Sequence, residues 1–190
     1  NCPIGELSIN ITGPTPVSLT SSLTFSNIIC SGENNGTIEF TVIKTPGHTP
    51  ACASFLFDNM LFCGDAIFMP DFGTGRCDFP LGSPETLYDS ITNKIYTLPS
   101  DTKIFVGHDY QPRGRELQYE TTVLDQQEKN IHINSSTNKD SFIRMRSERD
   151  KKLPSPKLLL PAIQVNINAG RLPKPEKNGK VYLKIPLAFN

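Results

Sequence analysis

Short apolar runs separated by polar and glycine-rich segments fill the first half of the chain. Residues 37–43 alternate apolar and polar side chains, and this period of two predicts a half-buried strand. Residues 51–57 and 60–63 predict two more strands joined by a tight turn. Residues 103–106 are a short β-branched and aromatic run, which predicts a fourth strand.

Three other segments have the period of an amphipathic helix. Ser83 is a predicted N-cap with Pro84 at the first helical position, and apolar residues then recur every three to four positions until Pro99. Residues 115–129 and 139–152 are two further predicted helices. Interleaved strands and helices predict a layered α/β fold.

Composition places the chain among ordinary globular proteins. It has 190 residues, 37% of them hydrophobic and 20% charged, and its 19 basic residues balance its 19 acidic ones. This charge balance leaves no net electrostatic field that would attract nucleic acid. No apolar run is long enough to cross a bilayer. We expect an N-terminal segment of loops and short strands at 1–36, a domain at 37–190, and an extended proline-rich tail with a short helix after residue 153.

Three potential metal ligands follow predicted strands. His48 lies in a Pro/Gly loop after the first strand, Asp65 follows residues 60–63, and His108 follows residues 103–106. A metal that keeps positions open for chemistry uses imidazole and carboxylate ligands on rigid strand ends. We therefore predict a metal site at these three residues. Taken singly, His48 is also compatible with a loop histidine bonded to a neighbour, and Asp65 with a turn former.

Four sequence segments carry a family resemblance. They are TPGHT at 45–49, GDAIFMPDFGTGRCDF at 64–79, HDY at 108–110 and LPAIQVNINAG at 160–170. Together they resemble the metallo-β-lactamase superfamily, in particular its persulfide dioxygenase and glyoxalase-II-like branch. The resemblance implies an αββα sandwich. The HxHxDH motif that precedes TPGHT in that superfamily is absent here, so we expect mainly the second αβ half and the C-terminal part of a longer enzyme.

The resemblance also implies a reaction. One Fe(II) would be held by His48, Asp65 and a histidine of the missing motif, with His108 close by. The enzyme would oxidise glutathione persulfide with dioxygen to sulfite and glutathione. Arg76 and Arg115 would bind substrate carboxylates, although a loop-bracing arginine is the alternative for Arg76.

Tyr110 is the remaining site candidate. Its hydroxyl could orient the substrate or a metal-bound water and so act in catalysis, and a purely packed tyrosine is the alternative.

Two other functions stay open at this point. The same fold could hold two Zn²⁺ ions and hydrolyse a glutathione thioester or a lactam. An inactive half-domain is the non-enzymatic alternative. The expected partner is a small molecule, with neither nucleic acid nor membrane involved, and a homodimer is left open. Cysteines without CxxC spacing favour a reducing compartment, the cytoplasm or, in a eukaryote, the mitochondrial matrix.

Four further residues or segments complete the set of expectations. Cys77 stands beside Arg76, which would lower its pKa if the two side chains were close, whereas Cys63 is expected to be a buried small hydrophobe. We assign His132 to structure. The stretch 144–152 is interpreted as a solvated helix face, because Arg144, Glu148 and Lys152 recur at i,i+4 spacing.

Overall fold

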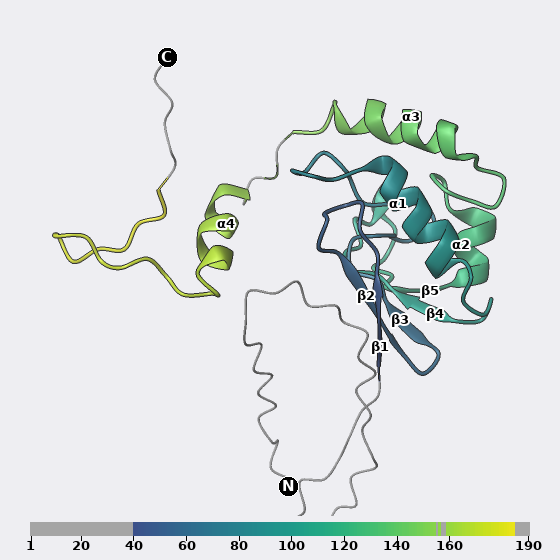
Figure 1. Cartoon of the computed structure of the whole chain (residues 1–190), viewed down its shortest axis with the longest axis horizontal. Coiled ribbons are helices and arrows are strands. Elements are labelled where there is room, and N and C mark those ends of the chain that lie inside the picture. The colour runs from purple at the N-terminus through teal and green to yellow at the C-terminus, as the bar shows by residue number, and fades with distance from the viewer. Residues whose placement is uncertain (1–39, 155, 157–158, 185–190) are drawn as a thin grey trace, which may run out of the picture. The chain divides into compact units, whose positions relative to one another are not determined.

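The structure, a computed structural model, describes residues 40–154, 156 and 159–184 (Figure 1). Our expectation for residues 1–36 concerns residues outside this description and stays a prediction. Five strands form one sheet in the order β1-β2-β3-β4-β5. They are β1 (Thr41–Lys44), β2 (Ala53–Phe57), β3 (Met60–Phe62), β4 (Lys103–Phe105) and β5 (Glu120–Thr122).

The strand pairing explains how two distant segments meet. Strands β1, β2 and β3 pair antiparallel in sequence order, whereas β3 runs parallel to β4 with Leu61 opposite Ile104. A parallel pair needs a crossover between its strands, and the segment between β3 and β4 contains a helix, as predicted. The ends of β3 and β4 therefore lie side by side at one edge of the sheet. Four of the five strands confirm sequence predictions.

The crossover helix begins where its cap predicts. The α-helix α1 (Pro84–Ser90) continues as a π-helical turn, η1 (Ile91–Ile95). The Ser83 hydroxyl accepts a hydrogen bond from the Thr86 N–H at 3.2 Å, which confirms the predicted N-cap. The apolar residues of this helix pack with the sheet in one fully buried cluster that includes Leu61, Leu87, Ile91, Ile95 and Ile104.

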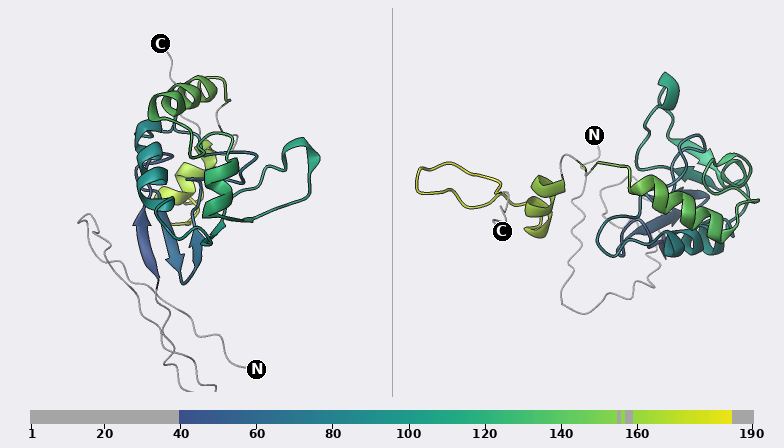
Figure 2. Two further views of the ribbon diagram at one scale, coloured as in Figure 1. Left: turned by 90° about the vertical axis from the view of Figure 1, so that its right-hand side faces the viewer. Right: turned by 90° about the horizontal axis from the view of Figure 1, so that it is seen from above.

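The helix predicted at 115–129 is wrong in its first half. A 3₁₀ turn, η2 (Pro112–Gly114), lies in a loop that projects from the rest of the fold (Figure 2), and residues 120–122 pair with β4 as the edge strand β5. Only α2 (Val123–Lys129) is helical, and Thr122 caps it by accepting from the Asp125 N–H at 3.1 Å. Pairing with β4 overrides the helical periodicity here, because it satisfies a row of backbone groups at the sheet edge.

Helix α3 (Lys139–Asp150) confirms the helix predicted at 139–152. The residues assigned to a solvated face, Arg144, Glu148 and Lys152, are exposed as expected. The same stretch nevertheless buries two charged residues: Arg146 and Asp150 are 2% and 4% exposed. The interpretation of 144–152 as a solvated helix face therefore holds for Arg144, Glu148 and Lys152 and fails for Arg146 and Asp150.

The two faces of the sheet differ sharply. One face carries Leu61 and Ile104 into the helix-covered core. The opposite face carries an aromatic row in which Phe62 stacks on Phe105 at 5.1 Å and Phe40 meets Phe55 edge-on at 5.6 Å. Phe55 and Phe62 remain 43% and 44% exposed. Helices cover one sheet face in the part of the chain that the structure describes, which matches one αβ half of the expected sandwich.

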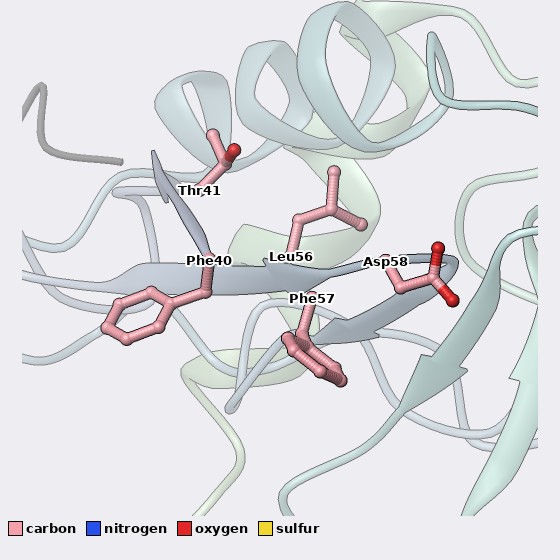
Figure 3. A pocket seen from close by; sticks show the side chains of 5 residues that line it. All are labelled: Phe40, Thr41, Leu56, Phe57 and Asp58. Atoms are coloured by element: carbon pink, nitrogen blue, oxygen red, sulfur yellow. The ribbon is translucent and has the colours of Figure 1, made fainter. Parts of the chain in front are cut away.

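A hollow beside β1 and β2 shows the same alternation. In Figure 3, Thr41 and Leu56 point to the helix side of the sheet, whereas Phe40 and Phe57 point away from it. Asp58 completes the lining at the turn after β2. None of these residues belongs to the predicted metal or substrate site.

Residues 152–190 form a separate unit. Its described part contains the expected short helix, α4 (Leu159–Ile167), which has no buried residue. After it the chain is extended with turns, and Lys184 returns to α4 by donating its backbone N–H to Gln164 Oε1 at 2.6 Å. Within the described ranges, no helix combines the length and apolarity that crossing a bilayer requires.

Candidate metal centre

The three predicted metal ligands meet at one place. The Nε2 atom of His48 lies 3.5 Å from one carboxylate oxygen of Asp65, and the Nε2 atom of His108 lies 3.5 Å from the other. Their side chains are 14%, 29% and 58% exposed for His48, Asp65 and His108, so the cluster opens toward solvent on the His108 side. The central carboxylate thus faces both imidazoles.

The sheet places Asp65 and His108 next to each other. Because β3 and β4 are parallel neighbours, the chain segments that leave them run on together. Two backbone hydrogen bonds extend the pairing past the strand ends, from Cys63 N to Phe105 O and from Gly107 N to Gly64 O, both at 3.1 Å. Gly107 also lies so close that an added Cβ would stand 2.8 Å from an Asp65 carboxylate oxygen. A side chain at residue 107 would therefore collide with the Asp65 carboxylate.

His48 reaches the cluster from the loop after β1, which is tied to α1. The carbonyl of Gly47 accepts from Ser83 N at 2.8 Å, and the hydroxyl of Ser90 donates to the carbonyl of Pro46 at 2.7 Å. Gly47 has a φ of +137° and packs directly against Leu87, where no side chain would fit. The glycine of the TPGHT loop is thus required by its backbone conformation and its contact with the helix.

The ring of His48 is held in one tautomer. Its Nδ1 atom lies 2.6 Å from the carbonyl oxygen of Arg76. A carbonyl can only accept, so this contact places a proton on Nδ1, and in the neutral ring the lone pair of Nε2 faces Asp65. A carbonyl behind the distal nitrogen is the usual orienting contact of a metal-binding histidine.

The donor set fits a metal as a partial set of ligands. Two imidazole Nε2 atoms and one carboxylate suit Fe(II) or Zn²⁺ and would leave further positions to other groups. Among the residues that the structure describes, no group of three or more His, Cys, Asp or Glu side chains is placed so that it could hold one metal ion. The histidines instead approach opposite oxygens of Asp65.

Arg76 lies beside the ligands but already has a carboxylate partner. Its Nε and Nη2 atoms donate to the two oxygens of Asp78, both at 2.5 Å, and its guanidinium carbon lies 5.6 Å from the centre of the Phe79 ring. This bidentate contact raises the pKa of Arg76 and lowers that of Asp78. Since the Phe79 ring also contacts His48 at 5.0 Å, Arg76 belongs to the wall of the site.

Arg115 is held between two carboxylates of the chain itself. Nε and Nη2 donate to Asp71 at 2.6 and 2.8 Å, while Nη1 and Nη2 donate to Asp109 at 2.7 Å each. The Asp109 side chain is 1% exposed and also accepts from the backbone N–H of Gln118 at 2.8 Å. These bonds, above all those from Arg115, lower the pKa of Asp109 to about 2. The contact between Arg115 and Asp109 directly follows His108 in the chain. It was not predicted from the sequence, where the only signal was the position of Asp109 in the segment HDY.

Tyr110 forms part of an aromatic wall next to His108. Its ring stacks on Phe72 at 4.4 Å, meets Phe68 edge-on at 5.5 Å and lies 5.9 Å from the His108 ring. Burial, followed by the charge of Asp65, raises the pKa of Tyr110. The hydroxyl therefore stays protonated at neutral pH and can donate a hydrogen bond.

Cys77 does not have the lowered pKa that a nearby Arg76 side chain would give. The thiol is 4% exposed, and burial, with a further contribution from Asp150, raises its pKa to about 12. Proximity to Arg76 in the sequence does not compensate, because that guanidinium faces Asp78. Cys63 is 1% exposed with its pKa raised to about 12 by burial, as expected for a small apolar core residue.

His132 is a structural residue, as assigned from the sequence. It is 7% exposed, and its Nδ1 atom accepts a hydrogen bond from the Thr74 N–H at 3.0 Å. Burial, and then the nearby cations Arg146 and Arg149, lower its pKa to about 3. The ring is therefore neutral and bonded to the loop that carries Arg76.

Comparison with protein families points to one superfamily. The family model described as metallo-beta-lactamase superfamily matches residues 15–108, a range that begins within the segment 1–36 and includes all three predicted metal ligands. A curated relative from Dictyostelium discoideum, glyoxylase B2, is 54% identical over 155 residues, which are 81% of this chain and 53% of the relative. The human mitochondrial persulfide dioxygenase ETHE1 is 32% identical over 66% of this chain and 46% of its own length.

A solved structure supports the same grouping. The crystal structure of ETHE1 from Myxococcus xanthus superimposes with a TM-score of 0.63 at 33% identity and covers 73% of this chain and 57% of that one. This chain spans about half the length of the curated relatives named above.

Proposed function

Because this chain belongs to the metallo-β-lactamase superfamily, we propose that its whole protein is a mononuclear iron persulfide dioxygenase. The reaction is GSSH + O₂ + H₂O → GSH + SO₃²⁻ + 2 H⁺, where GSSH is glutathione persulfide. The S–S bond breaks, the terminal sulfur is oxidised to sulfite, dioxygen is reduced, and glutathione is regenerated as the thiol. Water supplies the third oxygen atom of sulfite.

The agreement between two relatives carries this proposal. The protein from Myxococcus xanthus that superimposes at 33% identity and the human relative at 32% share the name ETHE1, and the human one is named a persulfide dioxygenase. The residues that match the family model include His48, Asp65 and His108, and the two histidines lie on either side of the Asp65 carboxylate. A reducing compartment, the cytoplasm or the mitochondrial matrix, and a homodimer stay predictions.

Each candidate residue has a role in this proposal. His48 and Asp65 would hold the iron together with a further ligand, and His108 would stand next to them. When bound, Fe(II) supplies the redox chemistry and open positions for the reactants. The Tyr110 hydroxyl donates a hydrogen bond to the substrate or to water at the site.

The two arginines have different roles in this proposal. Arg76, at the wall beside His48, binds a glutathione carboxylate either next to Asp78 or in its place. The guanidinium of Arg115 already binds two carboxylates of this chain, so Arg115 instead fixes Asp109 and with it the segment that carries His108. We therefore expect substitution of Arg76 to raise KM, and substitution of Arg115 to loosen the segment that carries His108.

Oxygen consumption tests the proposal directly. The iron-loaded whole protein should consume dioxygen and produce sulfite when it is given glutathione persulfide. The variant His48→Ala should lose this activity, whereas Arg144→Met, at an exposed position of α3, should retain it. An iron-loaded whole protein that consumes no dioxygen with this substrate would overturn the proposal.

A zinc hydrolase is the second candidate, and a specific observation favours it. Glyoxylase B2 shares 54% identity with this chain, more than the human persulfide dioxygenase does. A hydrolase would hold two Zn²⁺ ions, generate hydroxide near neutral pH and cleave a glutathione thioester. Metal analysis separates the candidates, because the first contains one iron and the second two zincs per chain. An inert half-domain, the remaining alternative, would leave the whole protein without bound metal.

A further inference from the structure

The loop of residues 73–77, here called the clamp loop, touches both His48 and Asp65. Its Arg76 carbonyl accepts from His48 Nδ1 at 2.6 Å. Gly75 packs against the backbone carbonyl of Asp65, where an added Cβ would collide, and that Cβ would stand 3.2 Å from His48 Nδ1. The position of this loop therefore sets where the His48 ring points.

Four buried side chains form hydrogen bonds with the backbone of the clamp loop. All four come from the segment 130–150, and each is less than a tenth exposed. The bonds are Asn130 Nδ2 to Gly73 O at 3.2 Å, Thr74 N to His132 Nδ1 at 3.0 Å, Arg146 Nη1 to Thr74 O at 3.1 Å, and Cys77 N to Asp150 Oδ2 at 2.8 Å. The clamp loop is thus fixed at residues 73, 74 and 77 by groups that water does not reach.

Two of these groups form a buried ion pair. Arg146 donates to Asp150 Oδ1 from Nε at 3.0 Å and from Nη2 at 2.6 Å, within α3. A buried pair of this kind often stabilises a fold no better than apolar residues of the same size. This pair, however, also bonds the clamp loop at Thr74 and Cys77, on either side of the residues that contact His48 and Asp65. Apolar side chains would fill the space without making these bonds.

We propose that Arg146 and Asp150 are positioning residues for the metal centre. They fix the clamp loop so that the Arg76 carbonyl holds His48 with its proton on Nδ1 and its Nε2 lone pair turned toward Asp65. The proposal rests on the proposed function only in taking His48 as a metal ligand. Removing Arg146 releases the Thr74 carbonyl and leaves Asp150 without its charge partner, which frees the loop and the ring.

Nitrogen NMR of the histidine rings tests this without any metal. The chain has three histidines, so its long-range ¹H–¹⁵N spectrum contains three imidazoles. At pH 8, where an unperturbed imidazole is neutral, His48 should show a single Nδ1–H tautomer in the unsubstituted chain. In Arg146→Met we expect signals of both His48 tautomers. The matched control Arg144→Met, an exposed arginine on the same helix, should keep the single tautomer.

Metal affinity supplies the second readout. Calorimetric titration of the full 190-residue chain with Co²⁺ should show 10- to 100-fold weaker binding in Arg146→Met than in Arg144→Met, the range typical for loss of a group that orients a ligand. If Arg146→Met does not fold, the double variant Arg146→Met/Asp150→Leu removes both charges and should give the same two results. A single His48 tautomer and unchanged Co²⁺ affinity in the folded variant would overturn the proposal.

The test of this positioning role and the test of the proposed dioxygenase can fail independently of each other. A whole protein that consumes no dioxygen, together with a His48 tautomer that responds to Arg146, would overturn the dioxygenase and support the positioning role. A whole protein that consumes dioxygen, together with a His48 tautomer that does not respond to Arg146, would support the dioxygenase and overturn the positioning role.

Discussion

His132 is a neutral imidazole buried in a protein whose other two histidines line the candidate site. Its pKa is lowered to about 3, whereas an unfolded histidine titrates near 6.5. Between these values the unfolded chain binds one more proton than the folded chain at this residue. The free energy of unfolding should therefore fall on acidification, by up to about 1.4 kcal/mol per pH unit below about pH 6.5, and the full contribution is present above that pH.

Urea unfolding at a series of pH values measures this slope. The variant His132→Asn provides the comparison, because its amide oxygen can still accept from the Thr74 N–H but does not titrate. Its slope between pH 6.5 and 4 should be smaller than that of the unsubstituted chain. Equal slopes in the two proteins would contradict the assignment.

The ring of Tyr110 is packed, and its hydroxyl is the hydrogen-bond donor of the proposed reaction. Tyr110→Phe should keep the stacking on Phe72 and the metal content, while kcat with glutathione persulfide falls about 100-fold through loss of the hydroxyl donor. Tyr119→Phe is the matched control, since that ring stacks on Phe105 away from the ligands. Steady-state oxygen uptake by the whole protein measures both. An unchanged kcat in Tyr110→Phe would show that the residue only packs.

Substitution of two adjacent residues of strand β3 should destabilise the fold to very different extents. Leu61 is fully buried on the helix side, whereas Phe62 is 44% exposed in the aromatic row on the other face. Leu61→Ala should reduce the free energy of unfolding by about 2–5 kcal/mol, as expected for a cavity in a packed core. Phe62→Ser should cost about 1 kcal/mol or less, because its ring is only partly removed from water.

Self-association provides the second measurement on this strand. A contiguous exposed apolar surface favours association, so Phe62→Ser should shift the sedimentation profile of the chain toward smaller species. Phe62→Leu, which keeps an apolar side chain on the same face, is the control and should sediment as the unsubstituted chain does. If Phe62→Ser sediments with the control, the aromatic row does not drive association.

Across the whole molecule, the number of imidazoles limits how tightly this chain can hold a metal. It has three histidines, and His132 is occupied with Thr74, so His48 and His108 are the two that can reach a metal beside Asp65. We expect weak Co²⁺ binding by the 190-residue chain, lost in Asp65→Ala, and binding at least about 100-fold tighter by a whole protein that supplies further ligands. Equal affinities would show that this chain alone provides the complete site.

Local sequence signals were sufficient where the interactions themselves are local. The Ser83 cap, the alternation at residues 37–43, the apolar runs of β2 to β4, and the position of each candidate metal ligand after a strand were all readable from neighbouring residues. The same reasoning failed at residues 115–122, where pairing with β4 decided the conformation. It also failed at Cys77, whose surroundings come from another part of the chain.

Residue types and near neighbours were enough to pick out the candidate metal ligands and the strands that precede them, because ligand chemistry and strand periodicity are local properties. The contacts that support these candidate ligands depend on the folded chain. Arg146 and Thr74 are 72 residues apart, and His132 and Thr74 are 58 apart. Contacts over such separations leave no periodic trace in the sequence, since they form only when helix α3 and the segment after α2 pack beneath the clamp loop.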